Sequence, residues 1–522
     1  MKPQKDYSLR GWTTLFIVLL VLGVVSFIPP VTIGGVSLRR ANIFSDLYTF
    51  DEIDNEASTD EVVLFDEAEF AVDLEAVTQQ IEADTLPHEV QRSFCWQVAP
   101  DSASRPAIRL DSARYVPKLT PIEDFSLEGR FATFCDSLLR ADRTVRIAVF
   151  GDSFIEGDIM TADLRERLQQ AYGGRGTGFA PMASPLTNFR RTVKTTSKGW
   201  TTYNIMQHKT TPEPLKQYYF VSGWVSRPSA GASTRWEATT FRRGLDSCSR
   251  ARILFIAPEE SRVELILNDS LHQDFTVEGA DVLREVVVEN SAIHALEFKV
   301  HEGAERLIGY GALFEDKGVE VDNYSVRSNN GQALFRTNPT INAQANDLIP
   351  YDLIILQYGL NIMQKGVLNY ASYGAQIEKM IAYARQCFPT AAVLVMGVSD
   401  RSVKEGDGFQ TMDAIPYMTE CQRTAAANQQ AAFWPTFDAM QAQGGMANFV
   451  SKGWAGKDYT HINYAGGRRV AWALFDAINA EVIKADERHR RRLEAERPII
   501  DSVKINELQI LPPADSTHVA TL

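Results

Sequence analysis

The chain has 522 residues, of which 45% are hydrophobic and 10% are aromatic. This is too long for one compact unit at roughly 100–200 residues per domain, so we expect two folded domains with accessory segments. The 53 basic and 66 acidic residues give a net charge of −13, which does not favour a nucleic acid partner. Five scattered cysteines without a C-x-x-C pair exclude a disulfide framework and a zinc ribbon, although one or two bridges stay open.

An apolar stretch near the N-terminus predicts a membrane segment. Residues 11–30 are uncharged, follow three basic residues and end at two prolines. A helix needs about 17–25 residues to cross a membrane, so we expect a short transmembrane anchor at 11–30, with residues 1–10 in the cytoplasm. A cleaved signal peptide is the alternative. The anchor predicts a single-pass protein of the inner (cytoplasmic) membrane, with its catalytic body facing the periplasm or the cell exterior.

Residues 31–120 predict an acidic spacer. Fifteen acidic residues and no Lys or Arg lie between Asp46 and Glu89, so the rest of the chain is close to neutral. The spacer is either a solvated linker or, where apolar residues recur at helical spacing from Phe70 to Ile81, in part an amphipathic helix.

Two stretches with alternating strands and helices predict an α/β domain in two parts. The first part, residues 121–189, contains a buried strand that ends at Phe150 and is followed by a helix. The second part, residues 317–497, contains buried strands at 351–357 and 392–397, each followed by a helix. Short apolar strands between helices are typical of an α/β sheet.

Residues 190–316, between these two parts, have a different pattern. Short β-rich runs alternate with turn residues and no helical pattern intervenes. Such spacing indicates an antiparallel sandwich, so we expect an all-β domain inserted into the α/β domain. The tail, residues 498–522, is expected to be extended or disordered.

Three short motifs carry candidate catalytic groups. Ser153, in Gly151-Asp152-Ser153, follows a buried strand at a turn that exposes its hydroxyl and its amide. Asp458 and His461, just before the last helix, can form a pair that leaves one imidazole nitrogen free as a base. Asn361 follows the second strand, where its amide can donate to a developing oxyanion. Each motif alone also has a common structural explanation: a helix cap, a local ion pair or an Asx turn.

Together and in this order, the three motifs resemble those of the SGNH, or GDSL-like, hydrolase family. The resemblance covers about Leu127 to Ile483 and implies a three-layer α/β/α sandwich with a mostly parallel sheet. It implies that Ser153 is the nucleophile, His461 the base and Asp458 its orienting partner. The Ser153 amide and Asn361 then line the oxyanion hole, and neither a metal nor an organic cofactor is required.

The family's remaining oxyanion donor is a glycine in a second motif, which falls within residues 325–331 of this chain. Gly331 is the better candidate, because glycine tolerates a positive φ. A register three residues earlier places Ser328 there, at a cost of roughly 1–2 kcal/mol if a positive φ is needed. An Asn-Gly turn without a catalytic role is a third interpretation.

Glycine-rich segments narrow the resemblance to exported peptidoglycan O-acetylesterases and their acetyltransferase relatives. They are Gly157-Asp158, residues 173–178 and Gly444-Gly445-Met446. Members of this branch also carry a carbohydrate-binding-like sandwich between the first two motifs.

The resemblance implies a membrane-anchored, exported serine esterase or acyltransferase that acts on O-acetyl groups of a cell-envelope glycan, such as peptidoglycan, through acetyl-Ser153. The expected partners are the acetylated glycan, the membrane and, for a transferase, a membrane-bound O-acyltransferase. The alternative is a non-catalytic glycan-binding or assembly protein on a hydrolase scaffold. A lipase or thioesterase is less favoured, because no apolar lid segment stands out.

Overall fold

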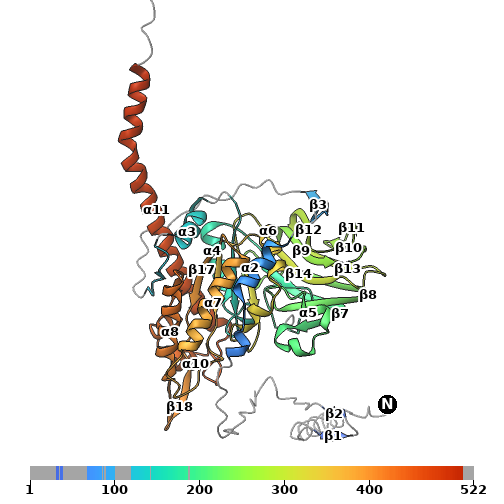
Figure 1. The fold of residues 1–522 in the computed structure, drawn as a ribbon, viewed down its shortest axis with the longest axis horizontal. Coiled ribbons are helices and arrows are strands. Elements are labelled where there is room, and N and C mark those ends of the chain that lie inside the picture. Colours follow the sequence, from blue (N-terminus) through green and yellow to red (C-terminus); the bar gives the residue numbers. More distant parts are fainter. Residues whose placement is uncertain are drawn as a thin grey trace, which may run out of the picture. The chain divides into compact units, whose positions relative to one another are not determined.

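A computed structural model describes the chain in the ranges 31–33, 36–38, 67–84, 86, 90–99, 119–127, 129–140, 143–185 and 189–509. The chain divides into two compact units, residues 1–66 and 67–522. In the first unit, the described residues form an antiparallel hairpin of β1 (Val31–Ile33) and β2 (Val36–Leu38). The second unit contains both large sheets (Figure 1) and the three candidate motifs.

A six-stranded sheet forms the α/β part. Its strands lie in the order β15, β5, β16, β17, β20 and β4, and all neighbours are parallel except β20 and β4. The bounds are β4 (Glu123–Asp124), β5 (Val145–Gly151), β15 (Val319–Ser325), β16 (Leu353–Gln357), β17 (Ala392–Met396) and β20 (Ala432–Trp434). Every residue of β5, β16 and β17 is buried, as expected for parallel strands that are covered on both faces. The three predicted strands are therefore confirmed.

Two groups of helices pack along this sheet. α11 (Tyr464–Gln509) contacts α3 (Arg130–Arg140) and α4 (Thr161–Tyr172). α7 (Ala371–Cys387) contacts α6 (Pro339–Leu348) and α8 (Ala414–Asn428). α11 continues past Pro498 to Gln509, where we expected an extended or disordered tail. Shorter elements are η1 (Glu67–Phe70), α2 (Leu74–Glu82), η2 (Glu156–Asp158), η3 (Ile205–Thr210), α5 (Glu213–Lys216), η4 (Gln332–Arg336), β18 (Ser402–Glu405), β19 (Gly408–Thr411), α9 (Thr436–Gln441) and α10 (Gly445–Ser451).

The second sheet has ten strands and is larger than the first. Eight of them lie in the order β11, β10, β13, β8, β14, β9, β12 and β3, while β6 pairs with β14 and β7 with β8. All pairs are antiparallel except β12 and β3. The bounds are β3 (Ser93–Ala99), β6 (Gly178–Pro181), β7 (Lys194–Asn204), β8 (Trp224–Glu237), β9 (Cys248–Ala257), β10 (Ser261–Leu267), β11 (Leu271–Val277), β12 (Ala280–Ile293), β13 (Ala295–Val300) and β14 (Ile308–Glu315).

The predicted fold class is therefore wrong. Instead of a clean three-layer α/β/α sandwich with a self-contained insert, the largest sheet is a ten-stranded mixed sheet that takes strands from outside residues 190–316. β3 comes from the predicted spacer and lies beside β12 (Figure 1), and β6 comes from the first α/β part. Sequence periodicity predicts that a strand forms, whereas its pairing partner depends on residues far away in the chain. The predicted domain boundaries stay predictions.

Part of the predicted spacer is folded. α2 confirms the amphipathic helix expected there, and Asp73 caps it by accepting the amides of Glu75 and Ala76. Phe70, just before α2, is fully buried and packs edge-on against Phe335 and Tyr373. This end of the acidic segment is therefore anchored to the α/β part by apolar contacts.

The predicted transmembrane anchor, residues 11–30, lies outside the described residues. In the part of the chain that the structure does describe, no helix combines the length and the apolar character needed to cross a membrane. On this finding, the predicted localisation as a single-pass protein of the inner membrane, with its body outside, is not supported.

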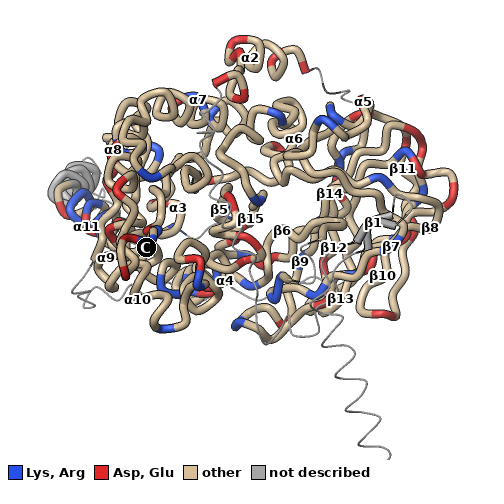
Figure 2. Tube along the Cα trace, turned by 90° about the horizontal axis from the view of Figure 1, so that it is seen from below, with Lys and Arg blue, Asp and Glu red and all other residues tan. Residues whose placement is uncertain are grey.

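Buried charges join β5 and β15 of the six-stranded sheet to β14 of the ten-stranded sheet. Figure 2 shows where the charged residues lie along the chain trace. Arg146 on β5 forms ion pairs with Glu315 on β14 and with Asp322 on β15. Arg252 on β9 also pairs with Glu315, at 2.9 Å. Burial works to raise the pKa of Glu315, but the two arginines outweigh it and lower the pKa to about 2. Glu315 is therefore an anion shared by strands of both sheets.

Glu320 on β15 is buried in the same region without a cation of its own. Burial raises its pKa well above the ordinary value, and the negative charge of Glu315 raises it further. A group whose pKa is raised on folding contributes stability that is complete below its unfolded pKa, about 4.3, and is lost as the pH rises through the folded pKa. The folded protein should therefore lose stability above about pH 4.3 because of Glu320.

We expect Glu320→Gln, which is neutral at every pH, to lose less of its thermal stability than the wild type between pH 4.5 and pH 8. Melting temperatures at both pH values measure this difference, and the exposed Glu260→Gln is the matched control. An equal change of melting temperature in the wild type and Glu320→Gln would contradict the assignment of Glu320 as a neutral buried acid.

Candidate active site

The serine turn, residues 151–158, lies at the carboxyl end of β5. Gly151 closes this strand and pairs with Ser325 on β15 and with Gln357 on β16. A Cβ atom at Gly151 would lie 2.6 Å from Oε1 and 3.0 Å from the carbonyl oxygen of Gln357, so a larger residue would force Gln357 to shift. Ser153 is partly exposed two residues later, and its amide has no hydrogen-bond partner among the described residues.

Three side chains form one hydrogen-bonded chain above this edge of the sheet. Ser153 Oγ lies 3.0 Å from His461 Nε2, although the two residues are 308 positions apart. His461 Nδ1 lies 2.6 Å from Asp458 Oδ2. Asp458 Oδ1 accepts the amides of Thr460 and His461, each at 3.1 Å. These two bonds hold the carboxylate against the ring, so the structure brings together the predicted nucleophile, base and orienting acid.

The pKa values of His461 and Asp458 are consistent with a role for His461 as a base. The hydrogen bond with Asp458 raises the pKa of His461 above its ordinary value, while burial and the Arg327 guanidinium work against this. Burial works to raise the pKa of Asp458, but its hydrogen bonds from His461 and Thr460 outweigh burial and lower the pKa to about 2. A neutral His461 that donates Nδ1–H to Asp458 presents Nε2 as an acceptor to the serine hydroxyl.

Asn361 lies beside Asp152 at the same edge of the sheet. Its Nδ2 donates to Asp152 Oδ2 at 3.1 Å and to the carbonyl oxygen of Asn329 at 3.0 Å. Asp152 Oδ1 accepts the amide of Phe154 at 2.9 Å, and burial raises the pKa of Asp152 to about 7. Asp152 therefore links the serine turn to the asparagine, a contact that sequence reasoning missed. The signal available for it is the position of Asp152 next to Ser153.

The two candidates for the remaining oxyanion donor differ in their surroundings. Gly331 has a φ of 104°, but its amide donates to Asn329 Oδ1 at 2.9 Å and a Cβ atom there would meet Met380. Ser328 has a φ of 61° and is exposed, and its amide has no partner among the residues that the structure describes. The positive φ is therefore present at both positions, and the unpaired amide favours Ser328. The role of Gly331 stays a prediction.

A buried acid beside the site also escaped sequence reasoning. Glu156, in the serine turn, is 2% exposed and accepts Arg327 Nε at 3.1 Å and Nη2 at 2.5 Å. The Arg327 side chain is largely exposed, and its charge acts on His461, whose pKa it lowers. The sequence shows an acid three residues after Ser153 and an arginine two residues beyond β15. Such residues are too common for a single sequence to predict that they pair.

Across the described ranges, no three His, Cys, Asp or Glu side chains are grouped in a way that could hold a metal ion. We assign no residue of the site to a metal or to an organic cofactor.

The fold of this chain has a counterpart among solved structures. No family model and no curated protein matches the sequence. A solved structure described as a peptidoglycan O-acetylesterase is 22% identical, and the match covers 70% of this chain and 99% of that chain with a TM-score of 0.56. A family two carbohydrate esterase from Cellvibrio japonicus is 7% identical, with 56% and 98% covered and a TM-score of 0.24. A GDSL-like lipase from Parabacteroides merdae is 13% identical, with 31% and 73% covered and a TM-score of 0.24.

Of these structures, the first shows a shared fold, because the match spans nearly all of that chain and its TM-score is 0.56. This chain therefore shares the fold of that structure, in line with the resemblance that the motifs around Ser153, Asn361 and Asp458 indicate.

Proposed function

We propose that this protein is a serine esterase that removes O-acetyl groups from a glycan, with peptidoglycan of the cell envelope as the first candidate. The hydrogen-bonded chain Ser153–His461–Asp458 is the observation that carries this proposal. The solved structure with the shared fold is described as a peptidoglycan O-acetylesterase, which supports an acetylated glycan as the substrate partner.

The first half of the proposed reaction forms acetyl-Ser153. His461 Nε2 takes the hydroxyl proton of Ser153 while Oγ attacks the carbonyl carbon of the acetyl ester. The tetrahedral intermediate collapses as His461 gives the proton to the leaving sugar oxygen, and the acetyl group stays on Oγ. Asp458 remains ionised and stabilises the imidazolium that forms in between.

The oxyanion of this intermediate needs donors at the same edge of the sheet. The amide of Ser153 and the amide of Ser328 are unpaired in the described part of the chain and can donate to it. Asn361 supplies a side-chain donor when one of its two Nδ2 hydrogens turns from Asp152 or Asn329 to the oxyanion. Removing one such donor costs about 2.7–4 kcal/mol in transition-state stabilisation.

The second half decides between hydrolysis and transfer. In hydrolysis, His461 takes a proton from water, the hydroxide attacks acetyl-Ser153, and acetate leaves as Ser153 regains its proton. In transfer, a sugar hydroxyl replaces water and the product is a new ester. Transfer would require an acyl donor, for which a membrane-bound O-acyltransferase is the proposed partner.

The direct test compares the wild type with Ser153→Ala and His461→Ala on p-nitrophenyl acetate. We expect each variant to lose at least about 10³-fold in kcat/KM, because neither group catalyses without the other. The exposed Ser197→Ala and His489→Ala are matched controls that should keep wild-type rates. Assays with acetylated glycan then measure whether acetate is released or the ester is transferred.

Full activity in Ser153→Ala would contradict the proposed nucleophile. A wild-type protein that binds glycan but hydrolyses no ester would instead be the non-catalytic glycan-binding protein of the alternative interpretation.

The pH profile tests the role of Asp458. We expect kcat/KM to rise with pH and to reach half of its maximum above pH 6.5, because His461 must be neutral and its pKa is raised. In Asp458→Asn the hydrogen bond that raises this pKa is lost, so the inflection should move to lower pH and the rate should fall by up to about 10⁴-fold. Identical inflections in the two proteins would exclude Asp458 as the partner of His461.

The oxyanion role of Asn361 predicts a change in kcat. Asn361→Ala should lower kcat on p-nitrophenyl acetate by about 10²–10³-fold with little change in KM, because the amide acts on charge that develops in the transition state. The exposed Asn428→Ala on α8 is a control of the same residue type. A rise in KM with unchanged kcat would show that Asn361 binds the substrate but does not stabilise the oxyanion.

A further inference from the structure

A groove at the seam between the two sheets lies next to the serine turn. The groove is small and partly open to solvent. One side is formed by Gly157 and Asp158 of the serine turn and by the end of β15. The other side is formed by residues of the ten-stranded sheet and of the segments that lead into it, including Thr195 and Trp224. The groove therefore belongs to neither sheet alone.

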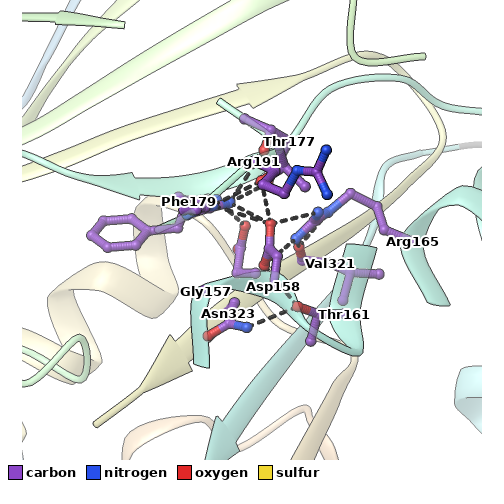
Figure 3. Close-up of polar contacts among 12 residues, drawn as sticks. Gly157, Asp158, Thr161, Arg165, Thr177, Phe179, Arg191, Val321 and Asn323 are labelled. Atoms are coloured by element: carbon purple, nitrogen blue, oxygen red, sulfur yellow. Dashed lines mark hydrogen bonds and ion pairs between the residues drawn. The ribbon is translucent and has the colours of Figure 1, made fainter. Parts of the chain in front are cut away.

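The charged groups at the floor of the groove are already paired with protein atoms (Figure 3). Asp158 accepts Arg165 Nη1 and Arg190 Nε, each at 3.1 Å, and the hydroxyl of Thr192 at 2.5 Å. The two guanidinium groups also donate to main-chain carbonyl oxygens, Arg165 to that of Val321 and Arg190 to those of Thr177 and Phe179. Burial works to raise the pKa of Asp158, but the two arginines outweigh it and lower the pKa. The floor therefore does not offer a single unpaired charge to a ligand.

Three neutral polar groups of the groove, in contrast, are unpaired. The hydroxyls of Thr195 and Ser325 and the indole N–H of Trp224 have no hydrogen-bond partner among the described residues. Pro181 and the ring of Trp224 add apolar surface to the same lining. A sugar ring combines hydroxyl groups with apolar C–H faces, and a tryptophan with a free N–H can contact both. The lining thus fits an uncharged sugar better than an ion or an acyl chain.

Contacts tie the groove to both catalytic loops. Tyr464, three residues after His461, donates its hydroxyl to the carbonyl oxygen of Gly157 at 2.6 Å. Ser325 pairs in register with Gly151, two residues before Ser153. Gly223, which precedes Trp224, lies so close to Val326 that a Cβ atom there would be 2.6 Å from Val326 Cγ2. A sugar in the groove would therefore sit beside the loops that carry the serine and the base.

We propose that this groove binds a neutral sugar residue of the glycan, next to the residue whose acetyl ester reaches Ser153. The proposal rests on the proposed esterase function and adds a subsite to it. Trp224 stacks on the ring, while Thr195 and Ser325 form hydrogen bonds with its hydroxyls. A substrate without a glycan chain, such as p-nitrophenyl acetate, makes none of these contacts.

The test is the ratio of kcat/KM on O-acetylated peptidoglycan fragments to kcat/KM on p-nitrophenyl acetate. We expect Trp224→Ala to lower this ratio at least about tenfold and the nearly isosteric Thr195→Val to lower it about threefold, as for the loss of one hydrogen bond. Tyr417→Ala, which removes an aromatic side chain that is 51% exposed on α8, should leave the ratio unchanged.

A binding measurement separates this proposal from the catalytic one. Calorimetry with de-O-acetylated peptidoglycan fragments should show weaker binding to Ser153→Ala/Trp224→Ala than to Ser153→Ala. Unchanged ratios and unchanged binding in the Trp224 and Thr195 variants would overturn the sugar subsite while the esterase function stands. A wild-type protein that hydrolyses neither substrate would overturn the esterase function itself, and the subsite would fall with it.

Discussion

The candidate active site depends on three parallel strands that end at the same position along the sheet. Gly151 pairs with Ser325 on one side and with Gln357 on the other, so β5, β15 and β16 stop together. The absence of a side chain at Gly151 permits this close register. The loops that follow these strands carry Ser153 and Asn361, which therefore meet at one edge of the sheet, where sites in parallel sheets commonly form.

The ten-stranded sheet is connected directly to the α/β part, because consecutive segments of the chain contribute to both. β6 follows α4 in the chain and pairs with β14, so the ten-stranded sheet takes a strand from the segment just after the helix of the serine turn. Arg146 and Glu315 then join the two sheets through buried charge. The proposed sugar groove and the proposed catalytic residues consequently lie in parts of the fold that are joined directly to each other.

Three buried acids show how their surroundings decide protonation in this fold. Asp158 lies between two arginines and is an anion, because their charges outweigh the cost of burial. Glu320 lies beside another carboxylate, and its pKa is raised well above the ordinary value, because burial and the charge of Glu315 outweigh the opposing charges of Arg146 and Arg165. Asp152 receives hydrogen bonds from an amide group and from Asn361 but has no ion-pair partner, and its pKa of about 7 lies between these extremes. The pKa of a buried carboxyl group in this protein is therefore set by the cations and hydrogen-bond donors around it.

The sequence by itself determined the local elements of this protein: the apolar strands β5, β16 and β17, the turn at Ser153 and the spacing that brings Asp458 to His461. These depend on residues only a few positions apart, and so does the helix in the spacer. The tertiary structure alone decided that β3 and β6 join one ten-stranded sheet, that Asp152 holds Asn361, and that a groove opens at the seam. Strand partners, burial and hydrogen bonds across hundreds of positions depend on how distant segments pack, and periodicity within one segment does not contain that information.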